Sequence, residues 1–350
     1  MKKKLAILLL TIVCVCSIYL IKDGNICAAD TSDIIRNDET GIPDKALYKA
    51  ILEELHKDKN RTFTKREAES IEELFANISR GGEKSVASLK GIGYLRNLKH
   101  LSLEGNSLTT LAGVEELYNL EKLTVDSGLL KSLEGIETLP NLKSLSAIYN
   151  ELTDLKGIEN MTNLEWLHVS ENDLKSLDEI KNLTNLVCIS AWGCNLKKLP
   201  DLTGFDKLDA VYCSFSGNYL SEKEFRSKLP QRFFDKSSDE YGQHRIKDQI
   251  IFQNQNYKVT LTAPAKNKIT KNTNKITGKA YKNSKIVLYD STEKIKIKKT
   301  ITDKKGKFVL SNLNLKKWAG KKLVIKIALL SSYGEYHPLT KTFTFKVRKK

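Results

Sequence analysis

A 22-residue pattern recurs six times between Leu98 and about Asn218, and it limits what this chain can fold into more than any other feature. Written from its first leucine, the unit reads L-x-x-L-x-L-x-x-N-x-L-x-x-L-x-G-I-x-x-L-x-N. The copy over residues 142–163 matches the leucine, asparagine and Gly-Ile positions closely. A unit this short cannot bury its own apolar side, so each copy has to stack on its neighbours.

A fixed period in the twenties with this leucine spacing indicates a leucine-rich repeat solenoid. We expect a parallel β-sheet on its concave face and short helical or 3-10 turns on its convex side. Side chains alternate along a strand, so positions one, four and six should point into the core. Positions three, five, seven and eight should then face outward from the concave sheet. Asn106, Asn150 and Asn172 are expected to hydrogen-bond the backbone of the turns.

The first 29 residues have the features of a secretory signal peptide. Basic residues precede an apolar run from Leu5 to Ile21, and Cys27-Ala28-Ala29 fits a cleavage site after Ala29. An uncleaved anchor is the alternative, because an apolar run of this length is near the lower limit for a membrane span. We therefore predict a secreted protein with no stable membrane span in its mature form.

The rest of the chain divides into four segments. Residues 30–88 should form a helical cap, with one helix over 43–55 and a second opened by the Thr64/Glu67 capping box and continuing to Phe75. Residues 89–230 hold the repeats and a closing helix, and 231–256 are a polar junction. From residue 257 to 350 the apolar period changes to two, which predicts a small Ig-like β-sandwich.

The sandwich segment is very basic. Residues 251–350 contain 25 Lys and Arg against 4 Asp and Glu, whereas the whole chain has a net charge of +16. Such a module attracts polyanions, and export makes an anionic wall polymer or a sulfated glycan a better match than nucleic acid. The alternative is that lysines cover the solvent face of the sandwich and protect its edges. The candidate polyanion-binding residues are Lys294, Lys296, Lys298, Lys299, Lys304, Lys305 and Lys307.

The order of segments resembles that of the internalin family of Gram-positive surface and secreted proteins. It consists of a signal peptide, a cap beginning Ile42-Pro43-Asp44, 22-residue repeats and a following Ig-like segment. The resemblance implies an adhesin, invasin or secreted virulence effector that binds a host receptor through the concave repeat face. The chain departs from the family in two features. Gly-Ile stands where a proline-containing turn is often found, and Lys349-Lys350 follow without an LPxTG sorting signal. We therefore expect secretion, with at most loose association with the wall.

The outward positions become aromatic toward the C-terminal repeats. Neighbouring strands lie about 4.8 Å apart, so these side chains should form one contiguous surface. Trp and Tyr are frequent anchors of protein interfaces, which makes this surface the candidate receptor site. Alternatively, Tyr212 and Phe215 pack under the closing helix and Trp166 lies against its neighbours. The candidate protein-binding residues are Tyr149, Trp166, His168, Trp192, Tyr212 and Phe215.

Catalysis has little support in the sequence, which lacks the common hydrolase, metalloprotease and phosphate-loop motifs. Cys188 and His168, expected on one face of adjacent strands, are the only conceivable nucleophile and base. Cys194 and Cys213 are expected to be small buried residues. We predict a binding protein without metal or cofactor. The alternative to a host-directed protein is a wall-associated scaffold held by its basic module.

Overall fold

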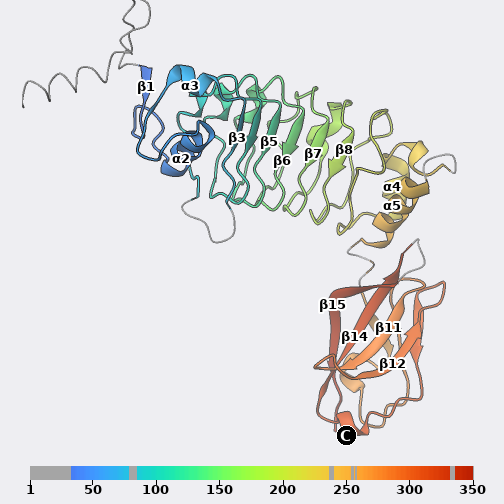
Figure 1. Cartoon of the computed structure of the whole chain (residues 1–350). Helices are drawn as coiled ribbons and strands as arrows, with labels where there is room; N and C mark the ends of the chain where they lie inside the picture. The colour runs from blue at the N-terminus through green and yellow to red at the C-terminus, as the bar shows by residue number, and fades with distance from the viewer. Residues whose placement is uncertain are drawn as a thin grey trace, which may run out of the picture.

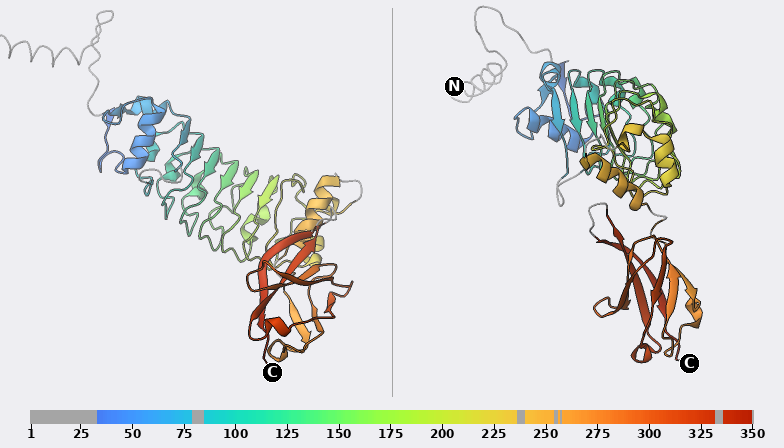
Figure 2. Two further views of the ribbon diagram at one scale, coloured as in Figure 1. Left: turned by 60° about the horizontal axis from the view of Figure 1, so that its bottom comes forward. Right: turned by 90° about the vertical axis from the view of Figure 1, so that its right-hand side faces the viewer.

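The computed structural model describes residues 33–78, 85–235, 240–253, 256, 258–331 and 336–349. The predicted signal peptide lies outside these residues. Figure 1 shows a stack of strands that begins next to the helical cap and ends at helices α4 and α5, with an antiparallel β-module beyond them. Figure 2 shows from two further directions that the module lies at the α5 end of the stack.

The N-terminal cap is joined to the first repeat through Asp44. Its Oδ1 caps helix α2 (Lys45–Glu54) by accepting from the amides of Ala46 and Leu47. Its Oδ2 accepts from the amides of Ala87 and Ser88, at 2.8 and 3.0 Å, just before the repeats. One carboxylate thus satisfies free amides on both sides of the boundary. The short strands β1 (Ile34–Ile35) and β2 (Phe63–Thr64) pair antiparallel beside this helix.

The second predicted helix is shorter than expected. The Thr64/Glu67 capping box is present, but α3 covers only Lys65–Glu69. Glu73–Phe75 form strand β3, which pairs in parallel with the first repeat strand. The apolar spacing that suggested a continuing helix instead serves a strand: Leu74 points into the core and Phe75 is exposed.

Six strands form the parallel sheet predicted from the repeat, in the order β3-β4-β5-β6-β7-β8. From β4 onward, partners are one repeat apart, as in Leu145 with Leu167. The central residue of each of these strands is buried and its two neighbours face away from the core; in β8 one of these neighbours, Cys188, is buried as well. The repeat strands are β4 (His100–Ser102), β5 (Lys122–Thr124), β6 (Ser144–Ser146), β7 (Trp166–His168) and β8 (Cys188–Ser190). The other side carries 3-10 turns η2 (Ile92–Tyr94), η3 (Val114–Glu116), η4 (Ile136–Thr138) and η5 (Asp178–Asn182).

The predicted asparagine ladder is confirmed. Asn150 accepts from the amide of Leu130 at 3.0 Å and donates to the carbonyl of Val125 at 2.8 Å. Asn106 and Asn172 make the equivalent bonds in their repeats. In the fifth repeat Cys194 takes this position, and its buried thiol donates to the carbonyl of Val169 at 3.1 Å.

The last repeat contains two extra residues, which the leucine pattern does not reveal. Ser190 pairs with Ser214, a spacing of 24 residues instead of 22. The extra length forms a turn over residues 210–212. Asn218 therefore becomes the ladder asparagine, accepting from the amides of Cys194 and Leu196 and donating to the carbonyl of Ala191.

Two glutamines of α5 (Glu240–Ile251) and the residues after it close the open end of the sheet. Gln249 accepts from the amide of Phe215 and donates to the carbonyl of Cys213, both at 2.8 Å. Gln253 likewise donates to the Phe215 carbonyl and accepts from the amide of Leu220. In the middle of the sheet, the next repeat would bond these backbone groups. At the end of the sheet, the two glutamine side chains bond them instead. The segment expected as a polar junction thus includes a capping helix, next to α4 (Glu222–Lys228) and η6 (Gln231–Phe233).

The C-terminal module has two antiparallel sheets, as the period-two pattern predicts. One has the order β13-β10-β9 and the other β12-β11-β14-β15. Its core, which includes Ile286, Leu288 and Phe308, is separate from the core of the repeats. The strands are β9 (Thr260–Ala263), β10 (Ile276–Lys279), β11 (Lys285–Asp290), β12 (Lys296–Ile301), β13 (Lys307–Leu310), β14 (Lys322–Leu330) and β15 (Tyr336–Lys346). Short 3-10 turns η8 (Lys266–Lys268) and η9 (Lys316–Trp318) connect them.

Candidate protein-binding surface

Five aromatic or imidazole side chains lie together on the outward face of the C-terminal repeats. Trp166 and His168 come from β7, on either side of the buried Leu167. Tyr149 and Trp192 follow β6 and β8, and Tyr212 lies in the turn of the last repeat. We call this set, Tyr149, Trp166, His168, Trp192 and Tyr212, the aromatic patch.

The rings of the aromatic patch contact one another in two groups. Trp166 lies 5.3 Å from Tyr212 and 6.4 Å from His168, between ring centres. Tyr149 meets Trp192 edge-on at 6.2 Å and 88°. These contacts hold the rings in place, yet Tyr149, Trp192 and Tyr212 remain 53%, 37% and 49% exposed. The patch therefore presents rigid apolar surface to solvent.

The backbone fixes where Tyr149 projects. Position eight of each repeat has a left-handed conformation, with φ of 55° at Tyr149 and 53° at Glu171. Glycine takes the same position in the first, fifth and last repeats. A non-glycine residue is uncommon in this region. At Tyr149 the chain accepts that strain while a large ring stays exposed and its amide donates to the Ser170 carbonyl at 3.0 Å.

Two expectations for this face were wrong, one in the last repeat and one in the fifth, and the alternative of packing under the closing helix holds for Phe215. Phe215 is fully buried and packs against Phe225 of α4, because the inserted turn moves it from position eight to the inward position six. Tyr212 lies in the inserted turn itself and is 49% exposed. Cys188 is only 1% exposed because it lies between Trp166 and Tyr212, whose rings meet, and its thiol donates to the Tyr212 carbonyl at 3.1 Å.

Burial lowers the pKa of His168 below its usual range, and Lys122 acts in the same direction, while Asp126 opposes both. The imidazole is therefore neutral at pH 7 and belongs chemically with the tryptophans. The Asp126 carboxylate accepts from the Ser146 hydroxyl and the Ile148 amide, at 2.7 and 2.8 Å. The patch thus has an uncharged centre with a carboxylate at its N-terminal side.

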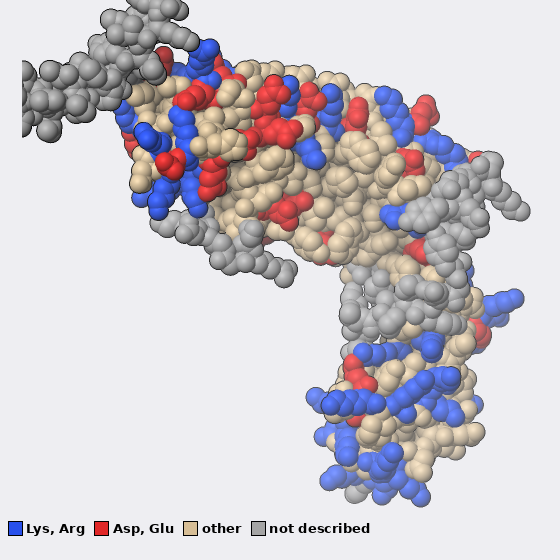
Figure 3. Space-filling view, viewed as in Figure 1, with Lys and Arg blue, Asp and Glu red and all other residues tan. Residues whose placement is uncertain are grey.

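The N-terminal half of the sheet carries charge instead. Lys99 pairs with Glu72, Lys143 with Glu121 and His100 with Glu73, at 2.8 to 2.9 Å. Figure 3 shows acidic and basic groups side by side along one edge of the repeats, with a broad uncharged area next to them. Phe75 is the exception at this end: it is 60% exposed opposite Ser102. Sequence analysis missed it because a helix was assigned there, although its parity with Leu74 would have placed it outward in a strand.

The structure distributes the predicted polyanion-binding lysines over two regions. Lys296, Lys298 and Lys299 lie on β12, an edge strand of the four-stranded sheet. Lys298 pairs with the core residue Leu288 and is partly buried, whereas Lys299 pairs with Val287 on the opposite face. Lys304, Lys305 and Lys307 lie in or beside the exposed turn before β13, and Lys294 precedes β12. Figure 3 shows many Lys and Arg and few Asp and Glu on the visible face of this module.

The thiol–imidazole hypothesis lacks a reactive thiol. Burial raises the pKa of Cys188 to about 11, so the thiolate needed for attack is scarce at neutral pH. Cys194 has a pKa of about 11 for the same reason, and burial raises that of Cys213 further. Within the described residues, no cluster of three His, Cys, Asp or Glu is arranged to hold a metal ion. The described helices also include none with the length and apolarity to cross a membrane.

The parallel sheet, the 3-10 turns and the asparagine ladder define a leucine-rich repeat protein with capped ends and an antiparallel β-module. No protein-family model and no curated protein matches the chain. Solved structures that match it include Listeria monocytogenes internalins. InlF is 26% identical over 55% of this chain and 61% of its own, with a TM-score of 0.43. InlJ is 24% identical over 53% and 39%, with a TM-score of 0.47, and internalin C2 is 21% identical over 58% and 96%, with a TM-score of 0.43. The chain thus spans less than two thirds of the InlF and InlJ chains.

Proposed function

We propose that this chain is a secreted, internalin-like binding protein whose aromatic patch contacts a host protein. The observation that carries the proposal is the contact network of Tyr149, Trp166, Trp192 and Tyr212 on the outward sheet face. Exposed rings held by their neighbours lose little conformational freedom on binding, and Trp and Tyr dominate the energetics of protein interfaces.

The partner is expected to bring an apolar surface to this patch. The patch itself has no charged member at pH 7, since His168 is neutral there. Binding at its centre should therefore depend weakly on salt, unlike attraction between exposed charges, which salt screens over about 10 Å at 0.1 M.

The test measures binding of the labelled full chain to mammalian cells at low and high salt. The double variant Trp166→Ala/Trp192→Ala should weaken binding by about 30-fold or more, because truncating a central anchor costs about 2 kcal/mol or more. Tyr118→Ala is the matched control, since Tyr118 is 61% exposed outside the patch. Unchanged binding by the folded double variant would refute the assignment.

A second function, retention on the bacterial wall by the basic module, is favoured by the exposed lysines around β12 and the following turn. We expect isolated walls to bind the chain at low salt and to release it as salt rises. Replacing Lys304, Lys305 and Lys307 with Gln should reduce this retention, while the tryptophan variant retains it. Retention that ignores both salt and the lysine substitutions would count against this function.

A further inference from the structure

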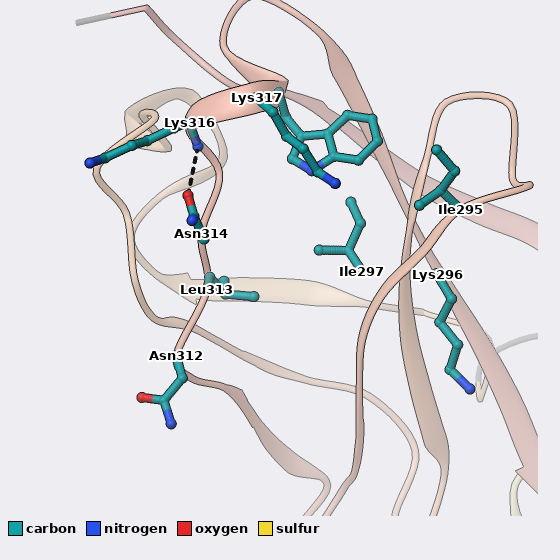
Figure 4. Close-up of a pocket in the computed structure, with 9 residues that line it drawn as sticks. Ile295, Lys296, Ile297, Asn312, Leu313, Asn314, Lys316 and Lys317 are labelled. Carbon is teal, nitrogen blue, oxygen red and sulfur yellow. Dashed lines mark hydrogen bonds between the residues drawn. The ribbon is translucent and has the colours of Figure 1, made fainter.

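A cleft of about 450 Å³ opens on the β-module, away from the repeats. One wall is the start of β12, around Ile295 and Ile297, and the other is the segment between β13 and β14. Figure 4 shows Ile297 and Leu313 turned toward the gap from opposite walls. A space of this size accommodates a small molecule.

The bottom of the cleft is apolar and continuous with the module core. Leu313 and Trp318 are 8% and 6% exposed and belong to that core. Ile297 is partly buried against this core. It is the extra residue of β12 at the point where the register between β11 and β12 shifts. Ile295, at the mouth, is 48% exposed. An apolar group entering here would cover surface that now contacts water.

The indole of Trp318 supplies an unused donor at this site. Its Nε1 is buried, and no acceptor for it is found among the described residues. A buried indole N–H normally has a hydrogen-bond partner, because leaving it without one is costly. Because this atom is buried, a ligand oxygen reaches it only when the side chains beside the ring move aside.

The charges around the cleft specify the sign of that acceptor. Lys296, Lys316 and Lys317 line it, and none of its lining residues is acidic. The ammonium groups of Lys317 and Lys321 lie 5.2 and 5.5 Å from the centre of the Trp318 ring. Figure 4 shows Lys316 and Lys317 on the wall that also carries Asn314. An anionic oxygen at this wall would meet a positive field.

We propose that this cleft binds a small amphipathic anion: an apolar body that carries one carboxylate, sulfate or phosphate group. The apolar body packs on Ile295, Ile297 and Leu313. The anionic oxygens pair with Lys317, whose side chain reaches toward the gap in Figure 4, and they lie in the positive field of the other lysines. This site is independent of the protein-binding surface on the repeats, and it requires a shaped apolar cavity, which a polyanion-binding lysine surface does not.

The test follows indole N–H resonances of the full chain, which has three tryptophans and so three such signals. Trp318→Phe assigns one of them by its disappearance. Decanoate, added below its micelle concentration, should shift the Trp318 signal saturably and leave those of Trp166 and Trp192 in place. Acetate and decanol, which each lack one half of the ligand, should shift it only weakly. A shift confined to Trp166 and Trp192, or an equal response to decanol, would overturn the proposal.

Variants separate the cleft from the general basicity of the module. Lys316→Gln/Lys317→Gln should raise the Kd for decanoate by about tenfold, as expected for losing charge-assisted bonds. Lys304→Gln/Lys305→Gln removes the same charge from an exposed turn outside the cleft and should leave the Kd unchanged. Ile295→Asp places a carboxylate at the exposed mouth and should abolish binding without disturbing the core. Equal weakening by the two lysine pairs, or binding only to anionic phospholipid vesicles, would show that no small-molecule site exists.

Discussion

At the scale of single residues, burial sets the chemistry of the repeat face. The large rings of Trp166 and Tyr212 meet, which hides Cys188 and leaves His168 partly covered. The buried thiol is held protonated and the partly buried imidazole is held neutral, each because burial disfavours its charged form. The face therefore offers aromatic surface to a partner and no reactive thiolate.

The lowered pKa of His168 gives stability a definite pH dependence. Above an unfolded-state pKa of about 6.5, both states are neutral at this residue and it contributes no slope. As pH falls below that value, the unfolded state takes up the proton first, so the native state loses stability. We expect Tm to fall between pH 7.5 and 5, and His168→Gln to reduce that fall. His56→Gln, which removes an exposed histidine of the cap, is the control. An identical pH profile for all three proteins would contradict the assignment.

At the scale of elements, the open ends of the sheet are the positions where stability is most sensitive to side chains. Gln249 provides the partners of the Phe215 amide and the Cys213 carbonyl. Gln249→Leu should leave both backbone groups buried and unpaired, at a cost of about 1–3 kcal/mol each. Hydrogen exchange at Phe215 should accelerate accordingly.

Gln231→Leu is the matched control for this element, because Gln231 is exposed and bonds only Asp235 among the interactions described for its side chain. We expect it to leave both the denaturant midpoint and the Phe215 exchange rate unchanged. If Gln249→Leu behaved in the same way, α5 would not be closing the sheet.

The packing of the elements also explains which parts of the fold could be predicted from the sequence. The 22-residue period predicts the strands, their register and the ladder asparagines because every repeat repeats the same buried contacts. The prediction from the period fails where a segment has different buried contacts from those of the regular repeats. The inserted turn at 210–212 leaves the leucine pattern intact while it moves Phe215 inward, and Glu73–Phe75 become a strand because the edge of β4 offers backbone partners. The capping role of Gln249 and Gln253 depends on contacts more than 30 residues away, which no local pattern contains.

At the scale of the whole molecule, two cores share one connecting segment. Ile250 packs against the core of the repeats, while Ile251 and Phe252 pack against the core of the module. The charges differ as well, since the basic residues are concentrated in the module. This arrangement places the two proposed binding surfaces on separate cores, the aromatic one on the repeats and the apolar and basic one on the module.

Separate cores predict separate unfolding. Scanning calorimetry of the full chain should show two transitions, because the buried apolar residues form two separate cores. Leu288→Ala, in the module core, and Leu145→Ala, in the repeat core, both replace fully buried leucines. Each should cost about 2–5 kcal/mol and lower only its own transition. If Leu145→Ala lowered both transitions equally, the two parts would unfold as one unit. In that case binding at one surface would be expected to alter stability at the other.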